Sequence, residues 1–260
     1  MRVTTRNARF QQWEALLANR TKRGRSGEFL VQGVRPITIA VERGWPIRCL
    51  LYAAGRRLSS WAHDVLRTTD AERVEMAPDL LAELAGKDDA ELVAVAALPP
   101  DDLSRITPTG PVIVFDRPSD PGNIGTVVRS ADAFGAAGVI VTGHAADVYD
   151  PKAVRASTGS LFAVPVVRAP APGVVADWAR TADIRIIGTD ETGTRDVSRC
   201  DLSVPALIVI GNETRGMSAS WLAACDEVVR IPIGGAASSL NAASAATVLL
   251  YEAARQREEK

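Results

Sequence analysis

The chain has 260 residues with 30 basic and 31 acidic side chains, so its formal net charge at pH 7 is −1. A hydrophobic content of 47% excludes a disordered chain and suffices for one large domain or two smaller ones. The scattered cysteines Cys49, Cys200 and Cys225 and only two histidines predict neither a disulfide framework nor a metal site. Because the sequence shows no membrane span and no signal-peptide core, we expect a soluble cytoplasmic protein.

Positive charge is concentrated in the first 35 residues, which hold eight basic and two acidic side chains, a net charge of +6. Three of these charges fall in the cluster TKRGRSG at 21–27, which is expected to be a loop. Basic loops near aromatic side chains are typical of nucleic-acid contact, although a solvated basic arm has the same composition. The RNA contacts predicted here are Arg6, Arg9, Lys22, Arg23 and Arg25.

The N-terminal part alternates between short helices and strands, which indicates a small α/β sandwich. Helices are expected at 8–18, 34–43, 58–67 and 78–85, and strands at 47–52, 73–77 and 92–98. A segment rich in Pro, Asp, Ser and Thr follows at 98–111 and predicts a domain boundary. The resulting division is a domain over 1–100, a linker over 101–111 and a second domain over 112–260.

The second domain alternates more strongly between helices and strands. Its strands are aliphatic runs in which polar residues do not alternate with apolar ones. Strands are expected at VIVFD, VIVTG, AVPVV, IRIIGTD, ALIVIGN and VVRIPI, and helices at 123–135, 151–158, 173–182, roughly 217–224 and 240–256. Strands of this kind are buried on both faces, so the pattern predicts a mostly parallel sheet covered by helices. Ligands of such sheets bind beyond the carboxyl ends of the strands.

The first loop with possible chemistry is DPGNIGTVVRSA, which follows the strand VIVFD. Its glycines do not form the G-x-G-x-x-G pattern of a dinucleotide site, and no Walker A pattern is present. Asn123 is a candidate N-cap for the helix that follows. Helical periodicity places Arg129 opposite the apolar face, where it is either a functional side chain or an ordinary solvated arginine.

The second loop, GNETRG, follows the strand ALIVI and contains Gly211, Asn212, Glu213 and Gly216. Glycine at the carboxyl end of a strand allows a ligand to approach the backbone closely. Glu213 is positioned either to orient a substrate group or simply to face water in a tight turn.

The third loop, IPIGGAASSLN, leads into the last helix, for which Ser239 is a candidate N-cap. From Ala242 to Tyr251 this helix is apolar nearly all round, so we expect it to be buried or to form a subunit interface. Asn241 at its head needs a hydrogen-bond partner if it is buried.

In their order and spacing, the three loops resemble the motifs of the SpoU/TrmH family of RNA ribose 2′-O-methyltransferases, which belongs to the SPOUT superfamily. The segments RNARFQQWEALL, EFLVQGVRPI, GHAADVYDPK and RASTGSLF extend the similarity, especially to members that methylate a uridine ribose in 23S rRNA and give antibiotic resistance. The resemblance implies an α/β fold in which a small N-terminal ribosomal-protein-L30-like domain binds RNA. It also implies a C-terminal domain with a trefoil knot, a homodimer, and an RNA partner in place of DNA or membrane.

The same resemblance implies S-adenosyl-L-methionine as the cofactor and gives roles to individual residues. Arg129 matches the catalytic arginine, which we interpret as a clamp on substrate phosphate that also stabilises developing negative charge. The implied catalytic set is Arg129, Asn123, Glu213, Ser239 and Asn241. The implied cofactor contacts are Gly211, Asn212, Ile231, Leu240 and Thr189. No metal is required.

The sequence leaves three alternative functions. A Rossmann-type enzyme is disfavoured because its glycine pattern is missing. A tRNA ribose methyltransferase has the same motifs, and a non-catalytic RNA-binding protein on the same scaffold is disfavoured by the intact site residues.

Overall fold

The computed structural model describes residues 1–259, and contacts within it divide the chain into two compact units. The first unit comprises Met1–Pro99 together with Asp147–Ala163. The second comprises Pro100–Ala146 and the chain from Val164 onward. A short segment from the middle of the chain therefore completes the N-terminal unit, which the sequence did not indicate.

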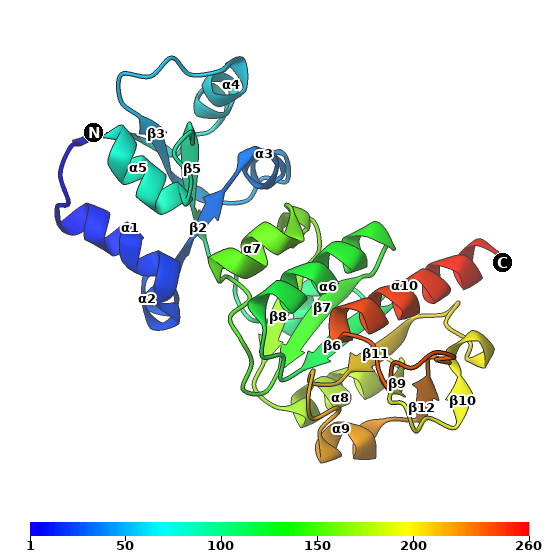
Figure 1. Cartoon of the computed structure of the whole chain (residues 1–260). Helices are drawn as coiled ribbons and strands as arrows, with labels where there is room; N and C mark the ends of the chain where they lie inside the picture. Colours follow the sequence, from blue (N-terminus) through cyan, green and yellow to red (C-terminus); the bar gives the residue numbers. More distant parts are fainter. Residues whose placement is uncertain (260) are drawn as a thin grey trace. The chain divides into compact units, whose positions relative to one another are not determined.

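The first unit is built on a mixed five-stranded sheet in the order β1-β4-β3-β5-β2 (Figure 1). Its strands are β1 (Arg2–Val3), β2 (Glu28–Gln32), β3 (Ile47–Ala53), β4 (Glu72–Met76) and β5 (Leu92–Ala97). Its helices are α1 (Ala8–Ala18), α2 (Arg20–Ser26), α3 (Val34–Glu42), α4 (Ser60–Thr68), α5 (Pro78–Ala85) and α7 (Pro151–Ser157), with a 3-10 turn η2 (Ser160–Phe162). The expected α/β character is confirmed, and β1, β2 and α2 are additional to the sequence prediction.

Helix α2 replaces the loop predicted for the basic cluster. Asn19 caps it by accepting a hydrogen bond from the Lys22 backbone at 3.0 Å. Gly27 ends it with a left-handed φ of 66°, a conformation that glycine adopts without a steric cost. The two caps stabilise a seven-residue helix in spite of Gly24 in its interior.

The second unit contains a seven-stranded sheet in the order β10-β12-β9-β11-β6-β7-β8 (Figure 1). All its strand pairs are parallel, which confirms the prediction from the aliphatic strands. The strands are β6 (Val112–Asp116), β7 (Gly138–Thr142), β8 (Val166–Ala169), β9 (Arg185–Thr189), β10 (Arg195–Asp196), β11 (Ala206–Ile210) and β12 (Glu227–Arg230).

Helices cover both faces of this sheet. In Figure 1, α6 (Pro121–Ala133) and α10 (Ala242–Glu258) pack together on one face, and α8 (Pro172–Thr181) and α9 (Ala219–Ala224) lie on the other. On the α8 and α9 side, Val114, Ile140, Val209 and Trp221 belong to one buried cluster. Burial on both faces explains why these strands lack polar alternation.

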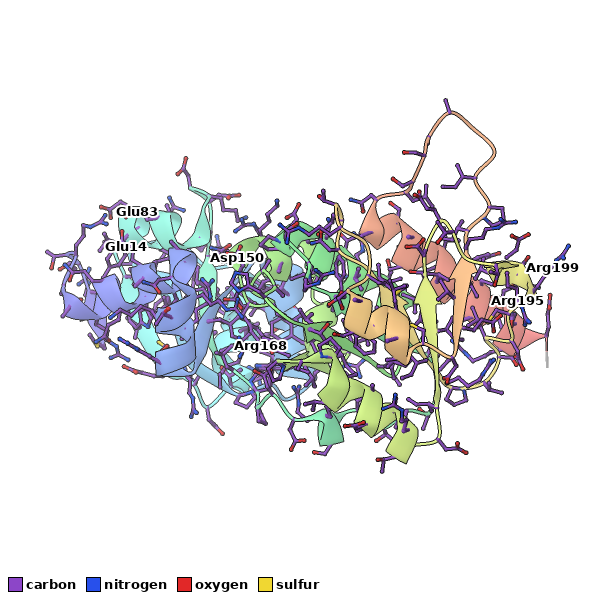
Figure 2. The ribbon with its side chains drawn as sticks, turned by 90° about the horizontal axis from the view of Figure 1, so that it is seen from below. Glu14, Glu83, Asp150, Arg168, Arg195 and Arg199 are labelled. Atoms are coloured by element: carbon purple, nitrogen blue, oxygen red, sulfur yellow. The ribbon has the colours of Figure 1, made fainter. Side chains whose placement is uncertain are left out.

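The segment predicted as a linker packs against the second unit. It contains a 3-10 turn, η1 (Leu103–Arg105), and Ile106, only 3% exposed, joins the core of that unit. Asp101 accepts hydrogen bonds from the backbone and the guanidinium of Arg168, a residue labelled in Figure 2. The segment is therefore an ordered edge of the second unit.

Helix α10 is buried along one face only. Ala243, Ala246 and Leu250 are buried, whereas Val248 and Tyr251 are 37% and 56% exposed. Its nearly uniform apolar sequence thus combines a core face with an exposed apolar face.

Candidate active site

The carboxyl ends of four parallel strands meet at one edge of the second unit. Ile210 of β11 lies level with Phe115 of β6, and Val229 of β12 lies level with Thr189 of β9. The loops that leave the sheet at this edge cover 117–120, 190–194, 211–218 and 231–241. All three motif loops of the sequence are therefore among the segments at this edge.

A pocket of about 520 Å³ opens here. Its lining includes every predicted cofactor contact and two of the predicted catalytic residues: Thr189, Gly211, Asn212, Ile231 and Leu240, with Glu213 and Ser239. Asn123, Arg129 and Asn241 are not part of the lining in the described chain. Residues from three separate strands and the start of α10 thus surround one cavity.

Gly211 has a different role from the ligand approach suggested by its place in the sequence. A Cβ atom at this position would lie 2.4 Å from backbone atoms of Gly216 and Met217. Asn212 and Gly216 exchange two backbone hydrogen bonds of 2.9 and 3.0 Å. Glycine is needed at 211 because the loop folds back on itself, and this tight turn forms one wall of the pocket.

Glu213 connects the loop after β11 to the start of α6. Its carboxylate accepts hydrogen bonds from the Ser119 backbone at 3.0 Å and the Ser119 hydroxyl at 2.8 Å. It also accepts from the Asp120 backbone at 3.3 Å, Asn123 Nδ2 at 3.0 Å and Asn212 Nδ2 at 3.2 Å. An ionised carboxylate is an acceptor only, so this set of donors matches its charged form.

The hydrogen bonds also determine the direction in which the pKa of Glu213 moves. Partial burial by itself would raise the pKa, but donors from Asn123 and Ser119 outweigh it, and the pKa falls below its ordinary value of 4.5. Glu213 is therefore a charged, fully engaged hydrogen-bond centre at neutral pH. A group of this kind is poorly suited to accept a proton.

Replacing Glu213 with glutamine should lower the free energy of unfolding of the second unit by about 1–3 kcal/mol at pH 7, because an amide cannot accept from all these donors. Since the folded-state pKa of Glu213 is depressed, its contribution is present above about pH 4.5 and is lost as the pH falls through the folded-state value. Urea unfolding of the variant and the wild type between pH 3 and 7 measures this difference. Glu191→Gln, at the same pocket, is the control, and a Glu213→Gln penalty that stays constant across this range would contradict the assignment.

Asn123 and Asn241 extend this connection to the third motif. Asn123 donates from Nδ2 to Glu213, and its Oδ1 accepts from Asn241 Nδ2 at 3.2 Å. Asn241 Oδ1 in turn accepts from the Ala243 and Ser244 backbone. One chain of hydrogen bonds therefore joins all three motifs and fixes the orientation of both amides.

Both N-cap predictions were wrong. Helix α6 begins at Pro121 and is capped by Asp120, which accepts from the Gly122 backbone at 2.8 Å. Helix α10 is capped by Asn241, and not by Ser239. In each case the stronger cap is the Asp or Asn directly before the first helical residue, and Asn123 is left with its side chain directed to Glu213.

Arg129 lies on the exposed side of α6, as its helical position predicts. The neighbouring Val127, Val128 and Ala131 are buried. No carboxylate within residues 1–259 forms an ion pair with the Arg129 guanidinium. Its charge is thus available to an external anion.

The loop that carries Ser239 is exposed along its length. Ile233 and Leu240 are large apolar side chains with 38% and 41% of their surface exposed. In Figure 2 this loop, drawn in orange between β12 and α10, projects from the second unit. Ser239 and Leu240 reach the pocket from this projecting segment.

The sequence did not indicate a role for Asp116 and Arg117, which hydrogen-bond to the loop after β11 that lines the pocket. Buried Asp116 accepts from the Ser218 backbone at 2.8 Å and from Arg117 Nε at 3.0 Å. Arg117 has a positive φ of 52° and donates from its second terminal nitrogen to the Gly216 carbonyl at 3.0 Å. The sequence feature that could have identified them is a charged residue directly at the end of a buried strand.

Two of the predicted RNA contacts in the first unit are neutralised by carboxylates of that unit. Arg6 pairs with Glu14 and Glu83, whose side chains lie side by side in Figure 2. Arg9 pairs with Glu72 through both terminal nitrogens. Each arginine remains partly exposed, but its charge is already balanced.

Arg23 was wrongly predicted as an RNA contact. Its side chain is only 3% exposed and pairs with Asp147 at 2.7 Å and with Asp150 at 3.7 Å. Lys22 and Arg25 are exposed, and neither has an ion-pair partner among residues 1–259. They are the two predicted contacts with charge available for RNA.

Within residues 1–259, no group of three or more His, Cys, Asp or Glu side chains is arranged to hold a metal ion. In the same range, no helix combines the length and the apolar character that crossing a membrane requires.

The model of the SpoU rRNA Methylase family matches residues 110–251, and that of the SpoU L30e-like domain matches residues 7–94. The chain belongs to the SpoU rRNA methylase family. The three motifs joined at the pocket all fall within residues 110–251. The first match falls mainly in the second unit and the second in the first unit.

Individual relatives match nearly the whole chain. The 23S rRNA (uridine(2479)-2′-O)-methyltransferase of Streptomyces viridochromogenes is 60% identical, over 98% of this chain and 92% of its own length. The crystal structure of the SpoU methyltransferase AviRb from the same species, in complex with AdoMet, has a TM-score of 0.92 at 59% identity and covers 97% of this chain and 99% of that one. An AdoMet-bound rRNA methyltransferase from Sinorhizobium meliloti has a TM-score of 0.88 at 29% identity, over 98% and 97% of the two chains.

Proposed function

We propose that this SpoU protein transfers a methyl group from S-adenosylmethionine to a ribose 2′-hydroxyl in 23S rRNA, with a uridine as the favoured target. The observation that carries the proposal is the hydrogen-bond chain from Glu213 through Asn123 to Asn241, which brings the three motifs together beside one pocket. The near full-length similarity to a uridine 2′-O-methyltransferase supports the choice of substrate.

The pocket residues fit the cofactor. A volume of about 520 Å³ is in the range of small-molecule sites. Apolar side chains suited to an adenine ring line it: Ile231, Ile233, Leu240 and Leu249. The carboxylates of Asp190 and Glu191 suit a ligand with an ammonium and a sulfonium group. When bound, the cofactor supplies an electrophilic methyl group.

The chain's own residues position the nucleophile. A ribose hydroxyl is a weak nucleophile near neutral pH, so it must be aligned with the methyl carbon. As the C–O bond forms, the bond between the methyl carbon and sulfur breaks to release S-adenosylhomocysteine, and the hydroxyl proton passes to water. Arg129 offers a guanidinium without an ion-pair partner among residues 1–259, which holds a substrate phosphate and stabilises negative charge on the ribose oxygen. Asn123 and Asn241, with fixed amides, and Ser239 orient the ribose, while Glu213 holds Asn123 in place.

We also propose roles for the two units, a knotted chain and a homodimeric assembly. The first unit binds RNA, the second transfers the methyl group, and the chain after β11 passes through a trefoil knot. The protein acts in the cytoplasm as a homodimer that covers the exposed apolar face of α10 at Val248 and Tyr251. Its modification of the ribosome gives antibiotic resistance.

Mapping of ribose methylation tests the function. We expect the purified protein, with labelled S-adenosylmethionine and unmodified 23S rRNA, to produce one stop in primer extension at low nucleotide concentration. Total tRNA is the comparison substrate. Methylation of tRNA alone would replace the proposed substrate, and cofactor binding without transfer to either RNA would support a binding protein.

We expect calorimetry to detect binding of S-adenosylmethionine without added metal, because residues 1–259 contain no group of three or more His, Cys, Asp or Glu side chains that could hold a metal ion. Treatment with EDTA should leave the affinity unchanged. An affinity that EDTA abolishes and a divalent ion restores would contradict this prediction.

A further inference from the structure

A second pocket lies entirely within the first unit, between α1 and α2. Its volume is about 560 Å³, which is large enough for one nucleotide. Buried Trp13 and Leu16 form an apolar floor. The pocket shares no lining residue with the pocket of the second unit.

The charged residues at this pocket distinguish it from the rest of the basic N-terminal segment. Lys22 and Arg25 line it, are exposed and have no ion-pair partner within residues 1–259. Arg9 and Arg23, close by in sequence, are both paired with carboxylates. The exposed charges of Lys22 and Arg25 thus both lie at this cavity.

Neutral hydrogen-bonding groups complete the lining. Gln11 and Gln12 of α1 and Ser26 of α2 contribute amides and a hydroxyl. Amides of this kind both donate and accept, which matches the mixed edge of a nucleobase. Half-buried Glu28 also lines the pocket, and its carboxylate can accept a hydrogen bond from the amino group of a base.

We propose that this pocket binds one unstacked nucleotide of single-stranded RNA. Lys22 and Arg25 hold its phosphate, the base lies against the floor of Trp13 and Leu16, and Gln11 and Gln12 contact the base edge. Sequence-specific RNA recognition commonly uses bases splayed out of single-stranded segments in this way. The inference rests on the proposed function, because it assigns part of the same RNA substrate to the first unit.

The test uses the full chain and two probes, a mixed-sequence single-stranded oligoribonucleotide and protein-free 23S rRNA, over a range of salt concentrations. Lys22→Ala combined with Arg25→Ala should weaken binding of both probes about tenfold and reduce the salt slope by about 0.7 for each phosphate that is no longer neutralised. Gln12→Ala should weaken binding about fivefold with an unchanged slope, since it removes a neutral hydrogen bond.

The matched control is Arg43→Ala combined with Arg73→Ala, which removes two other exposed charges of the first unit. An equal weakening of binding in the control and the Lys22/Arg25 variant would overturn the proposal in favour of general electrostatic attraction. So would competition by an acidic peptide that displaces the oligoribonucleotide. Methylation of 23S rRNA by the wild type, measured in parallel, shows separately whether the proposed function holds.

Discussion

Replacing Arg129 with alanine should lower methyl transfer to RNA by about a hundredfold or more, while thermal stability and affinity for S-adenosylmethionine stay close to wild type. The side chain is exposed on α6 and has no ion-pair partner in the described chain, so its removal leaves no cavity and no orphaned charge. It is also outside the lining of the proposed cofactor pocket. The measurements are single-turnover methylation of 23S rRNA and calorimetry with the cofactor.

Two further variants test whether the loss of activity is specific to the guanidinium at position 129. Arg129→Lys should also lose most activity, because an ammonium lacks the two-pronged geometry of a guanidinium. Arg199→Ala removes another exposed arginine of the second unit, labelled in Figure 2, and should retain full activity. A folded Arg129→Ala protein with turnover near wild type would return Arg129 to the role of a solvated helix residue.

Arg23→Ala should destabilise the first unit by about 3–5 kcal/mol, because it leaves Asp147 buried without its partner. Besides this ion pair, the Arg23 guanidinium donates to the carbonyls of Leu16 and Leu17. Arg23→Ala therefore removes hydrogen bonds to the end of α1 and also leaves Asp147 without its counter-charge. Urea unfolding followed by tryptophan fluorescence measures the decrease in stability.

Arg25→Ala is the matched control, since Arg25 is an exposed arginine only two positions along the chain from Arg23. Its stability should stay within about 0.5 kcal/mol of wild type. Adding Asp147→Ala to Arg23→Ala should recover part of the stability, because no charge then remains buried alone. Equal stability of Arg23→Ala and Arg25→Ala would show that the buried pair does not hold the first unit together.

Much of the fold could be predicted because buried strands and capped helices leave local patterns. The strand Val112–Asp116 and the helix Pro78–Ala85 have the bounds that their residues indicate. Helix α2 could not be recognised, because a glycine and several basic residues within seven positions resemble a loop unless the caps at Asn19 and Gly27 are considered together. The return of Asp147–Ala163 to the first unit depends on contacts with distant residues, which no local pattern contains.

The candidate site also depends on contacts between residues that are distant in sequence. Motif spacing located the residues that line the pocket, but not the bonds between them. The Asn123 amide is directed to Glu213, a partner 90 residues away, and sequence alone suggested a helix cap. Arg23 failed as an RNA contact for the same reason: its counter-charge lies 124 residues further along the chain.

The strand order of the second unit has a consequence for its folding during synthesis. Strand β6 pairs with β7 on one side, but its other neighbour is β11, which the ribosome produces only after β8 and β9. Until then a nascent chain presents the unpaired aliphatic edge VIVFD, which can pair with strands of other chains. Such late, non-local pairing slows folding, so we expect fast overexpression to give aggregates and a slower translation rate to raise the soluble yield.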